Sequence, residues 1–141
     1  MSETIIVGVD GSPTALKAAW SARDLAAALD ATVHVVCAFD KDRAEIVGTG
    51  SDKIILSDAV AADQVAKQVA DSIGTEVKVT YTAARGNPAD ALLTEATRVN
   101  ARMIVVGNRR MQGFGRVLGS VANTVAHNAG CDVYIAHTST P

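Results

Sequence analysis

The sequence has few aromatic side chains and only two cysteines. Aromatic residues make up 4% of the 141 residues while hydrophobic residues make up 48%, so the core must consist mainly of Val, Ile, Leu and Ala. Such a core suits parallel strands that are covered by helices on both faces. Cys37 and Cys131 lie far apart and have no histidine pattern beside them, which argues against a zinc site.

A large net charge and a long apolar run are also missing. The formal net charge is −2 and the isoelectric point is near 5.8, which argues against a general electrostatic attraction to nucleic acid or to an anionic membrane. No apolar run reaches the length of a membrane span, and the Met-Ser-Glu-Thr start lacks the basic region of a signal peptide. We therefore expect a cytoplasmic protein with no nucleic-acid partner and no membrane partner.

Strand patterns alternate with helix patterns along the whole chain. This alternation predicts βαβ units, a parallel sheet and right-handed crossovers within one α/β domain that spans residues 1–141. The apolar runs predict strands at 5–9, 33–38, 103–107 and 133–136, and a period-two alternation predicts a strand at 76–81 that is exposed on one side or lies at an edge. Helices are predicted after Ser12-Pro13, at 54–73, after Asn87-Pro88 and at 121–129.

Three further expectations concern the segments around these elements. Residues 40–53 are polar, include Gly48 and Gly50 and show no apolar period, so we expect a mobile connection there. We expect Trp20 to pack beneath the second strand or helix. His34 lies in an apolar strand, where a packed and hydrogen-bonded histidine is more common than a ligand.

The fourth predicted strand is followed by a glycine-rich loop that runs into the last helix. Residues 107–120 contain four glycines and three arginines, which are Gly107, Gly113, Gly115, Gly119, Arg109, Arg110 and Arg116. A helix N-terminus presents unpaired N–H groups and the positive end of the helix dipole. Glycines let the backbone approach an anion closely, and arginines can add charged hydrogen bonds. The loop therefore predicts a site for the phosphates of a nucleotide.

Two residues at this predicted site also have ordinary structural interpretations. Gly119-Ser120 can be a turn and helix cap, or Ser120 can give its hydroxyl to a phosphate. Asp10 follows the first strand, where it can cap nearby N–H groups or contact the ligand.

Known phosphate motifs and catalytic patterns do not fit the chain. The G-x-x-x-x-G-K-[ST] pattern of P-loop enzymes does not occur, and the glycines at 113–119 do not match the dinucleotide fingerprint. No Ser-His-Asp or Cys-His arrangement and no pair of carboxylates suited to acid–base catalysis is recognisable. We therefore expect a binding protein rather than an enzyme, with slow ATP hydrolysis left open.

The chain resembles the universal stress protein family over essentially its full length. The resemblance is carried by Ile6-Val7-Gly8-Val9-Asp10-Gly11-Ser12, Val105-Val106-Gly107-Asn108-Arg109, Leu118-Gly119-Ser120-Val121-Ala122 and Cys131-Asp132-Val133-Tyr134-Ile135. It implies a doubly wound, five-stranded parallel sheet of order 3-2-1-4-5 that binds ATP or another adenine nucleotide, with Mg²⁺ as a companion ion. It also implies a homodimer that is closed by the C-terminal strand.

The resemblance also assigns candidate binding residues, all named by their numbers in this chain. Gly107, Gly119 and Ser120 match three positions of the family's late glycine motif, and the adenine and ribose contacts fall on Val9, Asp10 and Ala38. Arg109, Gly113 and Val121 complete the set of candidate contacts with the nucleotide.

Arg110 stands where the family motif has its second glycine, and the loop that follows is one residue shorter than in the motif. Arg110 can clamp a phosphate, fill the terminal phosphate pocket or point into water. The function that follows is a stress-response regulatory protein that binds an adenine nucleotide. The alternative is a dimeric interaction module of the same fold that binds no nucleotide.

Overall fold

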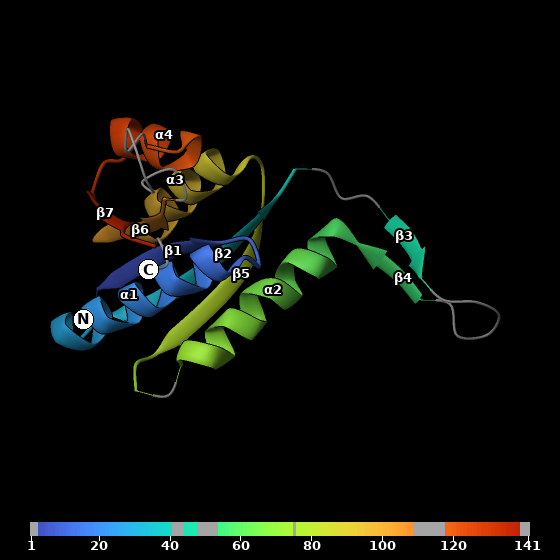
Figure 1. Ribbon diagram of the computed structural model, residues 1–141, viewed down its shortest axis with the longest axis horizontal. Helices are drawn as coiled ribbons and strands as arrows, with labels where there is room; N and C mark the ends of the chain where they lie inside the picture. The colour runs from blue at the N-terminus through green and yellow to red at the C-terminus, as the bar shows by residue number, and fades with distance from the viewer. Residues whose placement is uncertain (1–2, 41–43, 48–53, 75, 109–117, 139–141) are drawn as a thin grey trace.

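The chain folds as a twisted parallel sheet between two pairs of helices (Figure 1). The computed structural model describes residues 3–40, 44–47, 54–74, 76–108 and 118–138. The elements in chain order are β1 (Thr4–Val9), α1 (Pro13–Leu29), β2 (Thr32–Phe39), β3 (Ala44–Val47), β4 (Ile54–Ser57), α2 (Asp58–Ile73), β5 (Val79–Arg85), α3 (Pro88–Val99), β6 (Met103–Gly107), α4 (Ser120–Asn128) and β7 (Asp132–Ala136).

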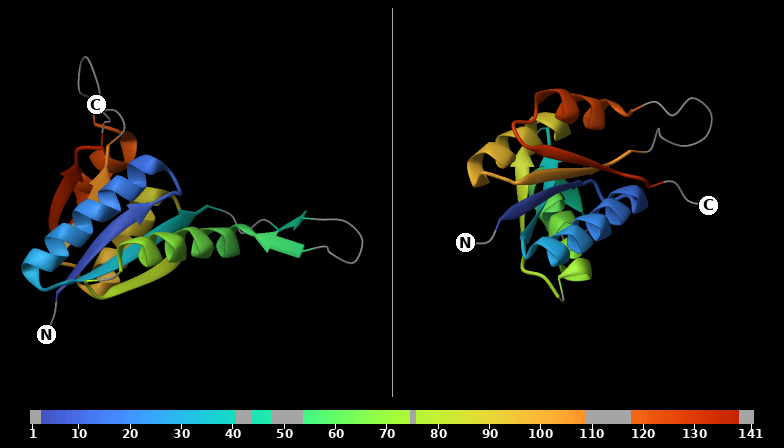
Figure 2. Two further views of the ribbon diagram at one scale, coloured as in Figure 1. Left: turned by 60° about the horizontal axis from the view of Figure 1, so that its bottom comes forward. Right: turned by 90° about the vertical axis from the view of Figure 1, so that its left-hand side faces the viewer.

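The main sheet has the strand order β5-β2-β1-β6-β7, and all four neighbouring pairs are parallel. Counted without the β3–β4 hairpin, this is the order 3-2-1-4-5, so the predicted fold class and topology are confirmed. Helices α1 and α2 cover one face, and α3 and α4 cover the other (Figure 2). The strand order reverses direction between β1 and β6, where α1 and α4 leave toward opposite faces.

The core is built from β-branched strand residues and from alanines on the helices. Ile5, Val7, Val33, Val35 and Val105 are fully buried on the face that is covered by α1 and α2. The small side chains allow these helices to approach the sheet closely, and the alanines that α1 buries are Ala15, Ala18, Ala19, Ala22 and Ala26. Among the described residues, no helix combines the length and the apolar character needed to cross a bilayer.

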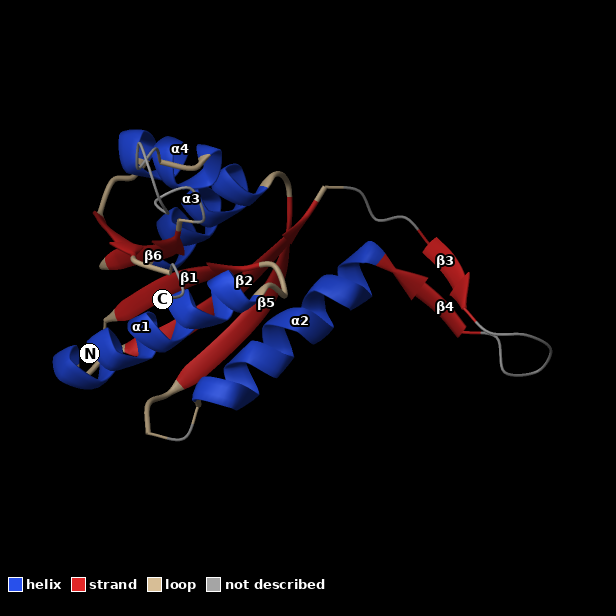
Figure 3. Ribbon diagram, in the orientation of Figure 1, coloured by secondary structure: helices blue, strands red, loops and turns tan. Residues whose placement is uncertain are grey.

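The expectation of a mobile connection at 40–53 followed by a helix from residue 54 is wrong in part. The chain forms an antiparallel hairpin in which β3 pairs with β4, from Ala44 opposite Ser57 to Val47 opposite Ile54. The hairpin projects away from the body of the domain (Figures 1 and 3). Ile54-Ile55-Leu56 is an apolar run that also suits a strand. Helix α2 begins only at Asp58, an acidic residue that the helix dipole favours in the first turn.

The third predicted strand and the tryptophan also differ from expectation. The strand occupies Val79–Arg85 rather than 76–81, because its register with β2 runs from Val33 opposite Val79 to Phe39 opposite Arg85. Trp20 is 42% exposed, and the Arg23 guanidinium carbon lies 5.4 Å from the centre of its ring. The buried side of α1 consists of alanines, so this bulky indole lies on the outer side in a cation–π contact.

His34 is buried and hydrogen-bonded, as predicted. Its Nδ1 lies 2.7 Å from Thr80 Oγ1 on β5, and its Nε2 lies 3.0 Å from Glu95 Oε2 on α3. Arg98 donates two further hydrogen bonds to Glu95, at 2.9 and 2.7 Å. The hydrogen bonds from Arg98 hold the pKa of Glu95 below its usual value, and the hydrogen bond from His34 acts in the same direction against the effect of burial. This cluster ties α3 to β2.

We predict that Glu95→Gln lowers the free energy of unfolding by about 1–2 kcal/mol near neutral pH, because two charged hydrogen bonds weaken. Since folding depresses the Glu95 pKa, its contribution is present above the ordinary value of 4.5 and is lost as pH falls through the folded-state value. The difference in the free energy of unfolding between wild type and variant, measured by urea unfolding, should therefore shrink as pH falls through the folded-state pKa of Glu95. Glu76→Gln is the matched control, since Glu76 forms an ion pair at an exposed position. A difference that stays constant with pH would contradict the prediction.

Candidate functional site

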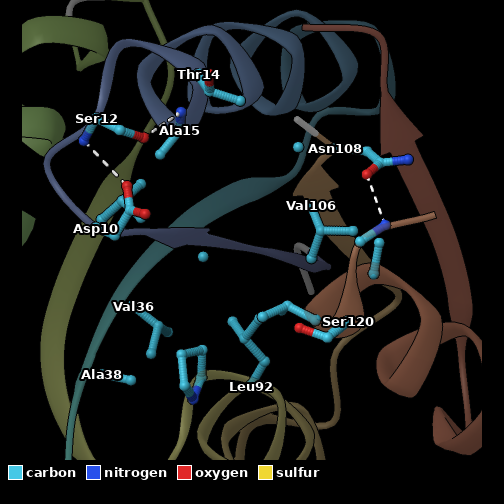
Figure 4. A pocket seen from close by; sticks show the side chains of 17 residues that line it. Asp10, Ser12, Thr14, Ala15, Val36, Ala38, Leu92, Val106, Asn108 and Ser120 are labelled. Atoms are coloured by element: carbon cyan, nitrogen blue, oxygen red, sulfur yellow. Dashed lines mark hydrogen bonds between the residues drawn. The ribbon is translucent and has the colours of Figure 1, made fainter. Parts of the chain in front are cut away.

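A pocket of about 330 Å³ opens at the carboxyl ends of β1 and β6, where the strand order reverses (Figure 4). Ligands of open α/β sheets bind at such points because neighbouring helices diverge there. The pocket is lined by Gly8, Val9, Asp10, Ser12, Thr14, Ala15, Val36, Ala38, Pro88, Leu92, Val106, Gly107, Asn108, Gly119, Ser120, Val121 and Ala122.

The turn from β1 into α1 forms one polar wall of the pocket. Asp10 Oδ1 accepts a hydrogen bond from the Ser12 backbone N–H at 3.0 Å, and Ser12 Oγ accepts one from the Ala15 N–H at 3.1 Å (Figure 4). Gly11 has a φ of +84°, which glycine adopts without steric cost. Asp10 therefore caps an N–H group of this turn, which is one of the two roles that the sequence left open for it, and it also lines the pocket.

An apolar wall lies opposite this turn. Val36 and Ala38 come from β2 and Leu92 comes from α3, and Figure 4 shows the three on the same side of the pocket. Leu92 lies directly over Gly8, where an added Cβ would lie 2.8 Å from Leu92 Cδ1. Gly8 therefore leaves the space in which Leu92 packs.

The start of α4 forms the third wall. Gly119 is the N-cap residue and Ser120 is the first helical residue. The N-cap Gly119 makes no side-chain cap hydrogen bond, and Ser120 lies one residue past the N-cap position, so the capping interpretation of Ser120 is not the one that the described residues show. The N–H groups of the first helical turn have no partner within a helix, and Ser120, Val121 and Ala122 all line the pocket.

Gly107 is surrounded by protein atoms at the end of β6. A Cβ at this position would lie 3.2 Å from Thr138 Cγ2 and 3.4 Å from Thr14 Cγ2. Packing against these two threonines is therefore a sufficient reason for glycine here, independently of any ligand.

The candidate residues that the structure describes all line this pocket. They are Val9, Asp10, Ala38, Gly107, Gly119, Ser120 and Val121. Arg109, Arg110 and Gly113 lie outside the described residues. The lining residues that sequence reasoning missed are Gly8, Ser12, Thr14, Ala15, Val36, Pro88, Leu92, Val106, Asn108 and Ala122. Asn108 could have been found from its position next to Gly107, whereas nothing in the sequence connects Leu92 with the ends of β1 and β6.

The thiol and the carboxylates near the pocket do not suggest a metal centre or a reactive cysteine. Burial raises the pKa of the Cys37 thiol, and the negative charge of Asp10 raises it further. Cys37 is 6% exposed and packs in the core, so it behaves as a small apolar residue. Within the described ranges, no group of three or more His, Cys, Asp or Glu side chains is arranged to hold a metal ion.

Comparison with known proteins agrees with this architecture. The model of the universal stress protein family matches residues 1–137. The chain belongs to this family. The Universal stress protein Rv1636 of Mycobacterium tuberculosis is 33% identical over 151 aligned positions, which cover 97% of each chain.

Solved structures of universal stress proteins have the same fold. One, a crystal structure in complex with cAMP, has a TM-score of 0.72 and 32% identity, and the match covers 98% of each chain. Another, from Archaeoglobus fulgidus in complex with dAMP, has a TM-score of 0.65 and 24% identity, and the match covers 94% of this chain and 96% of the other. The family and the fold that the sequence resemblance implied are therefore both confirmed.

We predict that Gly8→Ala displaces Leu92 toward the pocket of this universal stress protein. The short distance between the added Cβ and Leu92 Cδ1 should lower the free energy of unfolding by about 1–3 kcal/mol, as overpacking does elsewhere. Leu92→Val shortens the side chain, so the double variant should lose less stability than the two single variants added together. Denaturant unfolding of the four proteins measures this coupling. Strictly additive losses would show that the cost of Gly8→Ala does not come from its contact with Leu92.

Proposed function

We propose that this universal stress protein is a stress-response regulator that binds an adenine nucleotide in the pocket between β1 and β6. The observation that carries the proposal is one pocket that joins an apolar wall to a helix N-terminus. The apolar wall of Val36, Ala38 and Leu92 suits a flat base. The first turn of α4 offers N–H donors and the positive end of a helix dipole to a phosphate.

The dimensions and polar groups of the pocket agree with such a ligand. Its volume of about 330 Å³ lies at the lower end of the range of small-molecule sites. The Asp10 carboxylate can accept hydrogen bonds from ribose hydroxyls, and the Ser120 hydroxyl can donate to phosphate. A relative of similar length, at 32% identity, is described as a complex with cAMP, and this supports an adenine nucleotide as the ligand here.

We propose more specifically that the nucleotide is ATP together with Mg²⁺. Its outer phosphates would extend from the start of α4, and Mg²⁺ would be held mainly through those phosphates, as metal ions in nucleotide sites often are. We propose that the protein binds the nucleotide without rapid turnover, because the sequence offers no recognisable base or nucleophile for hydrolysis. We also propose that it does so in the cytoplasm.

The proposal predicts that ATP, ADP, AMP or cAMP raises the melting temperature. A ligand at 100 times its dissociation constant would add about 2.7 kcal/mol to the free energy of unfolding. Ala38→Phe should remove the effect, because the ring would occupy the space beside Val36 and Leu92. Ala28→Phe introduces the same ring at an exposed position near the end of α1 and should leave binding intact.

Thermal melts of the three proteins with each nucleotide measure this effect, and titration calorimetry measures the affinities. If the Ala38→Phe variant still binds nucleotide, the binding site lies elsewhere in the protein. If none of the four nucleotides binds the wild-type protein, the proposal fails and the nucleotide-free interaction module takes its place.

We also propose that the protein forms a symmetric homodimer through β7. This strand lies at one edge of the main sheet, and an edge strand leaves a row of backbone N–H and C=O groups for another strand to pair with. Tyr134 is 42% exposed on this strand, and Tyr81 is 39% exposed on β5 at the opposite edge.

Light scattering at micromolar concentration should therefore give about twice the chain mass of 14.6 kDa. Tyr134→Glu should shift the protein toward monomer, because two like charges would face each other across the two-fold axis. Tyr81→Glu is the matched control and should leave the dimer intact. A monomeric wild type, or a dimer that only Tyr81→Glu disrupts, would overturn the proposal.

A further inference from the structure

Asn108 is a buried polar residue that joins the two ends of the segment between β6 and α4. It follows directly after β6 and is 1% exposed. Its Oδ1 accepts a hydrogen bond of 2.8 Å from the backbone N–H of Gly119, the N-cap residue of α4. The side chain of Asn108 thus links the end of one element to the start of the next.

Two further contacts hold Asn108 itself in place. Its backbone carbonyl accepts a hydrogen bond of 3.4 Å from Oγ1 of Thr138, a buried residue that lies just after β7. A Cβ at Gly119 would lie 3.1 Å from Asn108 Oδ1, so the amide and the start of the helix are in tight contact. Asn108 is therefore packed between β6, α4 and the chain after β7.

This arrangement divides the N–H donors at the start of α4 into two groups. The Gly119 N–H donates its hydrogen bond to Asn108 Oδ1 (Figure 4). The first bond within the helix runs from the Asn123 N–H to the Gly119 carbonyl, so the N–H groups of residues 120–122 lie in the turn that has no partner within the helix. Those three residues line the pocket.

We propose that Asn108 is a positioning residue that aims the first turn of α4 at the phosphate of a bound nucleotide. It acts by fixing the position of Gly119. Asn108 should therefore affect the affinity for the phosphate. The base would lie against the wall of Val36, Ala38 and Leu92, so its binding should not depend on Asn108. This inference rests on the proposed nucleotide site and adds a residue that determines which part of the ligand is recognised.

The test compares adenosine with AMP, which share the base and ribose and differ by one phosphate. Asn108→Asp keeps the size and the acceptor oxygen but places a negative charge behind the helix N-terminus. It should weaken AMP about tenfold and change adenosine by less than about twofold, the size expected for one charged interaction. Because this effect depends on an ionised carboxyl, the loss relative to wild type should diminish as pH falls and the carboxyl protonates.

Asn108→Ser is the second variant, because its short hydroxyl cannot reach the Gly119 N–H. It should also weaken AMP selectively, but with no pH dependence beyond that of the wild type. Asn128→Asp makes the same substitution at an exposed position at the far end of α4 and should leave both affinities unchanged. Thermal melts identify any variant that fails to fold, and the remaining Asn108 variant then decides.

The outcomes separate this inference from the proposed function. If the wild type binds neither adenosine nor AMP, the proposed function fails and the role of Asn108 falls with it. If the wild type binds AMP and the Asn108 variants weaken both ligands equally, or neither, only the positioning role is overturned. Selective loss of AMP, with the pH dependence confined to Asn108→Asp, is the expected result.

Discussion

The divergence of α1 and α4 at the boundary between β1 and β6 is the constraint on which the site depends. Parallel strands bring their carboxyl ends to one edge of the sheet, and right-handed crossovers place each following helix on a face. Because β2 and β7 lie on opposite sides of the β1–β6 pair, α1 must leave toward one face and α4 toward the other. A crevice therefore opens between them.

Small residues determine how closely the surrounding elements approach this crevice. Gly8 admits Leu92, Gly107 admits Thr14 and Thr138, and Gly119 admits the Asn108 amide. Each glycine thus contacts a side chain from a different part of the chain. These three glycines serve internal packing, and the polar groups of the pocket are positioned through that packing.

The sequence was informative wherever a local pattern had one stable interpretation. Ser12-Pro13 and Asn87-Pro88 predicted helix starts, and both residues before proline cap their helices through side-chain hydrogen bonds. The apolar runs of β1, β2 and β6 appeared close to their predicted positions, because strands buried on both faces need continuous apolar sequence. Prediction failed where local preference was ambiguous, as in the apolar run at 54–56, which suits a strand or a helix until a pairing partner is known.

The sequence by itself determined the fold class, the family and several of the residues that flank the switch point, because these depend on periodicity and on motifs that are contiguous in the chain. Tertiary structure alone decided that Leu92 completes the apolar wall, that Trp20 lies outside the core, and that Asn108 holds Gly119. The contacts of Leu92 and Asn108 join residues from separate elements, and the position of Trp20 depends on which side of α1 packs against the sheet. Their existence depends on distances across the folded sheet and its helices, and no spacing along the chain encodes such distances.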